Sequence, residues 1–190
     1  MQTTPEKIEI EIVRSRRRTL SLEITEDLKV KIRAPYGVSK RRIRQFAADK
    51  MDWIVKNIQK MQLKQEKINA VEKLTREELE QLADRAGEVI PARVAYFAKQ
   101  LQVTYGRITI RNQQTRWGSC SAKGNLNFNC LLMLTPPGIV DYIVVHELCH
   151  RLEMNHSKRF WAHVATQIPD YRSCEKWLKE NGSIIMARNR

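Results

Sequence analysis

The stretch that decides the fold is Asp141–Trp161, which reads DYIVVHELCHRLEMNHSKRFW. It contains His146, Glu147 and His150 in the order H-E-x-x-H, and His156 follows a few residues later. Successive residues of an α-helix turn by about 100°, so side chains four apart point in nearly the same direction. His146 and His150 are therefore predicted to share one face of a helix.

This spacing suits metal chemistry. Two imidazoles on one helical face can each give a ring nitrogen to a single zinc ion, which leaves room for another side chain and a water. Glu147 lies beside that face, where it can take a proton from that water without being a ligand. We expect the helix to end after the motif, with Asn155 as a left-handed residue and Ser157 as the cap of the next helix. The predicted ligands of one zinc ion are His146, His150 and His156.

The surroundings of the motif favour a metal over a chance match. The helix is apolar on nearly every side, which predicts burial; the residues responsible are Ile139, Val140, Ile143, Val144 and Val145. Buried titratable side chains are costly without a partner, and a metal is the simplest partner. His163 is expected to be a surface group or a neighbour of a ligand, and Cys149 a small core residue.

Four segments carry a resemblance to a known family. They read RWGSCS at Arg116–Ser121, then GNLNFN, then LTPPGIVDYIVVHELCHRLEMNHSKRFW, and finally PDYRSCEKWLKENG. Together they resemble the YgjP-like metallopeptidase family, a relative of the SprT-like and Wss-type zinc proteases. The resemblance implies that the three histidines bind zinc, that Glu147 is the general base and that the substrate is a peptide or protein. The metzincin signature fits less well, because Glu153 stands where that signature needs glycine and a Met-turn is doubtful.

The resemblance also implies a substrate cleft. In zinc proteases of this general build, an edge strand above the metal pairs with an extended peptide through main-chain hydrogen bonds. Arg116 and Trp117 would then shape the cleft. The alternative is that Trp117 belongs to the core and Arg116 is a surface charge. Tyr171 is a further candidate substrate residue, as a group that stabilises an oxyanion.

Composition limits the class of protein. The 190 residues are 42% hydrophobic, which is enough for a substantial core. No apolar run is long enough for a membrane helix, and Met1–Leu20 has no signal-peptide core, so we expect a cytoplasmic protein without a membrane partner. The cysteines form no C-x-x-C pair, which argues against a zinc ribbon or a disulfide framework; they are Cys120, Cys130, Cys149 and Cys174.

The net charge of +13 is unevenly distributed, since residues 1–64 carry 16 Lys or Arg against 8 Asp or Glu. A basic N-terminal surface can bind nucleic acid non-specifically, or it can simply be solvated. Two alternative functions follow: a nucleic-acid-associated protein with a structural zinc site, and a DNA-associated protease. A third hypothesis is a latent enzyme whose cleft is closed by its own N-terminal elements.

Hydrophobic periodicity predicts an α+β fold. Apolar and charged residues alternate over 7–13, 20–24 and 28–32, which predicts an antiparallel β-meander. Helical spacing over 39–65 and 75–101 predicts two long helices. Thr75 and Glu78 should open the second with a capping box, and Pro91 should kink or divide it.

Strand-like composition returns over 107–111, 116–121 and 125–134. We expect these strands to form a small antiparallel sheet against the active-site helix, in the zincin-like core that the resemblance implies. The expected domains are 1–74, with the N-terminal strands and a basic amphipathic helix, and 75–190, the catalytic core. One compact domain is the alternative. The charged segment 62–73 is either a linker or a continuation of the first helix.

Overall fold

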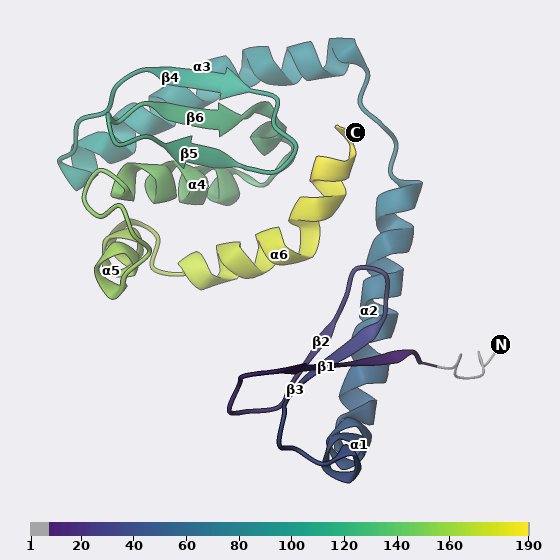
Figure 1. The fold of residues 1–190 in the computed structure, drawn as a ribbon. Coiled ribbons are helices and arrows are strands. Elements are labelled where there is room, and N and C mark those ends of the chain that lie inside the picture. Colours follow the sequence, from purple (N-terminus) through teal and green to yellow (C-terminus); the bar gives the residue numbers. More distant parts are fainter. Residues whose placement is uncertain (1–7, 190) are drawn as a thin grey trace. The chain divides into compact units, whose positions relative to one another are not determined.

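The computed structural model describes residues 8–189, and the chain falls into two compact units. Unit 1 reaches Ala70 and unit 2 begins at Val71. Both units combine helices with a small three-stranded sheet, so the predicted α+β class is confirmed (Figure 1). The expected domain boundary at residue 74 stays a prediction.

The sheet of unit 1 contains β1 (Ile10–Ser15), β2 (Ser21–Ile24) and β3 (Val30–Pro35) in the order β1-β3-β2. β2 and β3 form an antiparallel hairpin, but β1 pairs in parallel with β3. The predicted antiparallel meander is therefore wrong for the first strand. Burial matches this order: in the central strand β3, Val30, Ile32 and Ala34 are fully buried. On the edge strand β1, Ile12 remains 47% exposed.

Two helices complete unit 1. Helix α1 (Lys40–Asp49) begins at the N-cap Ser39, whose side chain accepts a hydrogen bond from the Arg42 amide. Helix α2 (Met51–Ala70) follows after a break at Lys50, so the single long helix predicted here is wrong. Because of the break, α1 contacts β3 while α2 contacts β2. Ile43 of α1 and Ile54 of α2 are buried in the same small core. The charged segment 62–73 continues α2 as far as Ala70.

Unit 2 begins with α3 (Arg76–Leu101). Its predicted capping box is present, because the Thr75 side chain accepts from the Glu78 amide and the Glu78 carboxylate accepts from the Thr75 amide. Pro91 does not divide the helix. The chain leaves α3 at Gln102, which has a left-handed backbone with φ of 54°.

The sheet of unit 2 contains β4 (Ile108–Arg111), β5 (Gly118–Cys120) and β6 (Leu126–Asn129) in the order β4-β6-β5. β5 is antiparallel to β6, but β4 is parallel to it, so the predicted antiparallel sheet is in fact mixed. Burial again matches the order: in the central strand β6, Leu126 and Phe128 are fully buried. β5 is consequently an edge strand, and it lies against α4.

The remaining elements surround the core of unit 2. They are the 3-10 helix η1 (Cys130–Leu134), α4 (Pro137–Cys149), α5 (Lys158–Gln167) and α6 (Tyr171–Ala187). Helix α4 contacts α3, α5, α6 and β5. Such a central helix must be apolar all round, and nine of its residues are buried. No helix among residues 8–189 is both long and apolar enough to cross a bilayer.

Candidate metal centre and active-site cleft

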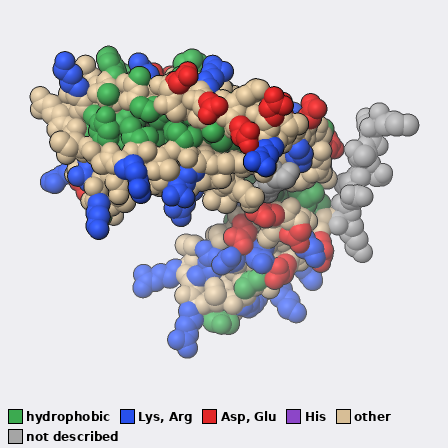
Figure 2. All heavy atoms as spheres, turned by 90° about the horizontal axis from the view of Figure 1, so that it is seen from above, with side chains coloured by type: hydrophobic (Ala, Val, Ile, Leu, Met, Phe, Trp, Pro, Cys, Tyr) green, Lys and Arg blue, Asp and Glu red, His purple; other side chains and the backbone are tan. Residues whose placement is uncertain are grey.

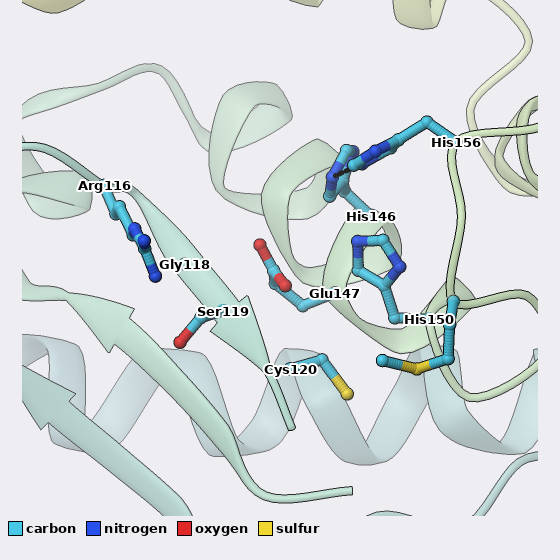
Figure 3. Close-up of a pocket in the computed structure, with 9 residues that line it drawn as sticks. Arg116, Gly118, Ser119, Cys120, His146, Glu147, His150 and His156 are labelled. Atoms are coloured by element: carbon cyan, nitrogen blue, oxygen red, sulfur yellow. Dashed lines mark hydrogen bonds between the residues drawn. The ribbon is translucent and has the colours of Figure 1, made fainter. Parts of the chain in front are cut away.

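Three histidine side chains of unit 2 converge on one point. His146 and His150 come from the end of α4, and His156 comes from the loop that follows it. One ring nitrogen of each lies within 4.8 Å of the others, and no further His, Cys, Asp or Glu of the described residues joins this group. The Nε2 atoms of His146 and His156 are 3.0 Å apart. Figure 3 shows the three rings gathered on the side of Glu147 away from β5.

The loop after α4 brings His156 back to the helix. The helix ends at Cys149, and the amide of Glu153 still donates to the Cys149 carbonyl. Asn155 has no left-handed conformation, so that part of the prediction is wrong: the chain turns in the residues directly after His150 instead. Ser157 caps α5 as predicted, accepting from the amides of Arg159 and Phe160.

Packing fixes the orientation of the rings. The buried Phe160 ring lies 4.7–4.9 Å, centroid to centroid, from all three imidazoles. The His150 Nδ1 atom lies 3.2 Å from the Glu153 carbonyl oxygen. If Nδ1 donates there, Nε2 of His150 keeps its lone pair for a metal. Phe160 thus supports all three rings.

Burial disfavours the charged form of His146 and His150. Burial, together with the neighbouring His150 and His156, lowers the pKa of His146 to about 3. The pKa of His150 is also lowered, mainly by burial. Neutral imidazole is the form that binds metals, and three convergent ring nitrogens fit a zinc ion by their chemistry and their spacing.

Glu147 lies between the histidines and the edge strand. Among residues 8–189, it is one of two polar side chains that are buried, with 6% of its surface exposed. Burial raises the pKa of its carboxyl to about 8, while the charge of Arg116 acts in the opposite direction. Its side chain rests against Gly118 of β5, where an added Cβ would lie 2.8 Å from Glu147 Cγ and Oε1. Only glycine leaves this space for the carboxylate.

Two adjoining pockets open on this centre. The metal pocket, of about 360 Å³, is lined by Arg116, Gly118, Ser119, Cys120, His146, Glu147, His150, Met154 and His156. Figure 3 shows the β5 residues on one wall and Glu147 with the histidines on the other. The side pocket, of about 350 Å³, shares four of these residues and adds Trp117, Tyr142, Ile143, Glu175 and Leu178.

The predicted substrate residues have different places. Arg116 is exposed and lines both pockets, whereas Trp117 lines the side pocket and also packs on the core. Tyr171 lines neither pocket; its ring stacks on Trp161 at 5.0 Å, and Trp161 in turn lies 5.8 Å from His156. Its role in substrate binding stays a prediction. Cys149 is fully buried in the core, as expected.

Sequence reasoning missed several residues of the cleft, including Gly118, Met154 and Glu175. Glycine inside a strand is a known sign of close approach by another group, so Gly118 had a detectable signal. Glu175 had none, because nothing in the local sequence of α6 indicates that this helix lies beside the cleft.

A histidine triad next to a buried carboxylate and a sheet edge defines the class of metal-dependent hydrolases. The family model described as "YgjP-like, metallopeptidase domain" matches residues 18–80 and 63–181. The chain therefore belongs to the YgjP-like metallopeptidase family.

Two solved structures are partly similar to this chain. The metallopeptidase zymogen abylysin of Pyrococcus abyssi is 18% identical, with a TM-score of 0.45, over 48% of this chain and 94% of that one. The metallopeptidase zymogen jannalysin of Methanocaldococcus jannaschii is also 18% identical, with a TM-score of 0.41, over 49% of this chain and 97% of that one. No curated protein sequence matches the chain.

Proposed function

We propose that this protein is a zinc-dependent peptidase that binds one zinc ion through His146, His150 and His156. The observation that carries the proposal is the convergence of three histidine ring nitrogens beside the buried side chain of Glu147. Family membership supports peptide-bond hydrolysis, and the nitrogen donors favour zinc over the hard cations that prefer oxygen ligands.

Glu147 is the proposed general base. When bound, zinc supplies positive charge that lowers the pKa of a water molecule toward about 7 and favours the ionised form of a nearby carboxylate. The Glu147 carboxylate then takes the proton from the attacking water and passes it to the leaving nitrogen of the substrate. Its burial suits this role, because a carboxyl with a raised pKa both accepts and releases a proton near neutral pH.

Strand β5 is the proposed binding site for the substrate backbone. It is an edge strand, it lines the metal pocket, and its outer edge pairs with no strand of the described residues. An extended peptide can pair with such an edge and thereby present a peptide bond to Glu147. Arg116, exposed two residues before β5, would contact the same peptide.

The test combines metal analysis with peptide cleavage. Purified wild-type protein should hold one zinc per chain, and alanine at any of the three histidines should abolish it, while His163→Ala should keep it. Glu147→Gln should keep zinc and lose cleavage of a mixed peptide library, with Glu180→Gln as a control on the exposed face of α6. Full activity in Glu147→Gln would refute the assigned base, and absence of zinc in the wild type would refute the function.

A second candidate function is non-specific binding of nucleic acid by unit 1. A pocket of about 390 Å³ there is lined by Arg14, Lys40 and Arg44 together with the exposed Ile12. However, Arg14 donates to the carbonyls of Pro35, Tyr36 and Val38 and so has a structural role. The comparisons give no support to this candidate.

The surface charge does not strengthen this second candidate. Figure 2 shows Lys and Arg side chains spread over the visible face, with Asp and Glu side chains among them. Titration with single-stranded and duplex DNA over a salt series decides the question. Binding that weakens steeply with salt is expected if phosphates are contacted, and no binding at low salt would remove the candidate.

A further inference from the structure

The side pocket of unit 2 has a composition that the proposed chemistry does not require. It shares Arg116, Gly118, His146 and Glu147 with the metal pocket, so a peptide bond held at the metal would place a neighbouring side chain at its entrance. The other lining residues are mostly aromatic or aliphatic: Trp117, Tyr142, Ile143 and Leu178. One further residue, Glu175 on α6, places an exposed carboxylate on this apolar wall.

The charges of the pocket favour a cation. Its acidic residues are Glu147 and Glu175, and its basic residue is Arg116. Glu147 is buried and is assigned to the proposed proton transfer, whereas Glu175 is exposed. Glu175 is thus the carboxylate that remains for a substrate. The negative charge of Glu175 acts on Tyr142 in the pocket wall. After burial, it is the largest cause of the raised pKa of Tyr142.

We propose that the side pocket receives a lysine or arginine side chain of the substrate, next to the cleaved bond, and that Glu175 selects it. The aliphatic stem packs on Trp117, Ile143 and Leu178, and the cationic end reaches the Glu175 carboxylate at the rim. The faces of Trp117 and Tyr142 add attraction for the same cation. This inference rests on the proposed peptidase function and names the substrate class of that site.

The shape of the pocket is maintained from α6. Gly182 lies against the indole of Trp117, where an added Cβ would lie 3.4 Å from Cζ2 and Nε1. Trp117 is therefore held between β5 and α6 as one wall of the pocket. Glu175 and Gly182 lie on the same helix, two turns apart, so α6 supplies both the charge and the support.

The test uses the zinc-loaded full chain and two sets of peptides. In one set only the residue before the scissile bond varies, and in the other only the residue after it. The varied position holds lysine, glutamate or leucine. Wild type should cleave the lysine peptide with a higher kcat/KM than the glutamate peptide. Glu175→Gln should reduce this ratio by roughly tenfold, as expected for the loss of one charge-assisted hydrogen bond at an exposed site. Glu175→Lys should invert the preference, whereas Glu180→Gln, on the same helix and outside the pocket, should keep the wild-type ratio.

A second measurement does not depend on turnover. N-acetyl-lysine hydroxamate and N-acetyl-glutamate hydroxamate should differ in affinity for the zinc-loaded wild type and lose that difference in Glu175→Gln. Zinc content and circular dichroism confirm that each variant is folded. If wild type and Glu175→Gln have the same ratio of kcat/KM for the lysine and glutamate peptides, or if wild type prefers the glutamate peptide, the proposed selectivity is overturned. Either result would leave the peptidase function standing. Failure of the zinc-loaded wild type to cleave any peptide would overturn the peptidase function on which it rests.

Discussion

Replacement of Gly118 by alanine tests how the edge strand positions Glu147. The added Cβ would lie 2.8 Å from Cγ and Oε1 of Glu147 and 3.1 Å from its Cδ. Real Cβ atoms do not approach other heavy atoms this closely, so either the carboxylate or the strand must move. The backbone of Gly118 does not have positive φ, so the methyl group itself is the only obstacle.

The size of the effect follows from the contact distance. Ordinary contact begins near 3.4 Å, so Glu147 must shift by about 0.6 Å or the strand must give way, at a cost of about 1–3 kcal/mol for such overpacking. A displacement of about 1 Å can reduce a catalysed rate by about 100-fold. We therefore expect kcat to fall by roughly 10- to 100-fold, with zinc still bound because no histidine is touched.

The assay is kcat and KM for a cleavable peptide, together with zinc content and thermal unfolding. Gly138→Ala is the matched control, because it lies on the same helix as Glu147 and nothing is within 4 Å of its added Cβ. It should keep activity and zinc. If Gly118→Ala has wild-type kcat and wild-type stability, the close packing of Glu147 on β5 is not what positions the carboxylate.

Three further predictions concern stability and the metal site. In the metal-free protein, the folded state holds the Glu147 proton up to about pH 8 while the unfolded state loses it near pH 4.5. Stability should therefore fall as pH rises between these values, by on the order of 5 kcal/mol, and Glu147→Gln should be the more stable chain above pH 8 in denaturant unfolding. Parallel pH profiles of the two chains would contradict the raised pKa. Ser157→Ala removes the cap of α5, which should lower the free energy of unfolding by about 1 kcal/mol. It should also weaken zinc binding in a chelator competition, because the cap fixes the chain next to His156. Unchanged zinc affinity would show that the loop is held without the cap. Gly87 is exposed inside α3, and nothing lies within 4 Å of a Cβ added there. Because alanine favours the helix more than glycine does, Gly87→Ala should stabilise the protein by up to about 1 kcal/mol and raise Tm without changing zinc content. A lowered Tm would mean that the added methyl group meets an obstacle.

Some features of this protein depend only on short stretches of sequence. The four-residue spacing of His146 and His150 places them on one helical face wherever the helix lies, and Ser157 caps α5 with its own next residues. The capping box of Thr75 and Glu78 is local in the same way. Such features are predictable because the backbone geometry of a few neighbouring residues decides them.

The order of the strands was decided only by tertiary structure. The alternation of β1 and β4 correctly indicates strands, but it contains no information on the partner, and both strands pair in parallel with a later strand. The strands of each sheet compete for the central place, and β3 and β6, whose apolar side chains are fully buried, take it. Alternation within one strand cannot express this competition between strands.

The sequence by itself determined that the three histidines converge beside a carboxylate, since one helix and one capped turn bring them together. Tertiary structure alone decided what surrounds them: Gly118 against Glu147, and Glu175 of α6 on the wall of the side pocket. These contacts join segments far apart in the chain, and they depend on how whole elements pack around α4. The physical reason is that helical geometry acts over a few residues, whereas the shape of a cleft is set by the packing of the entire core.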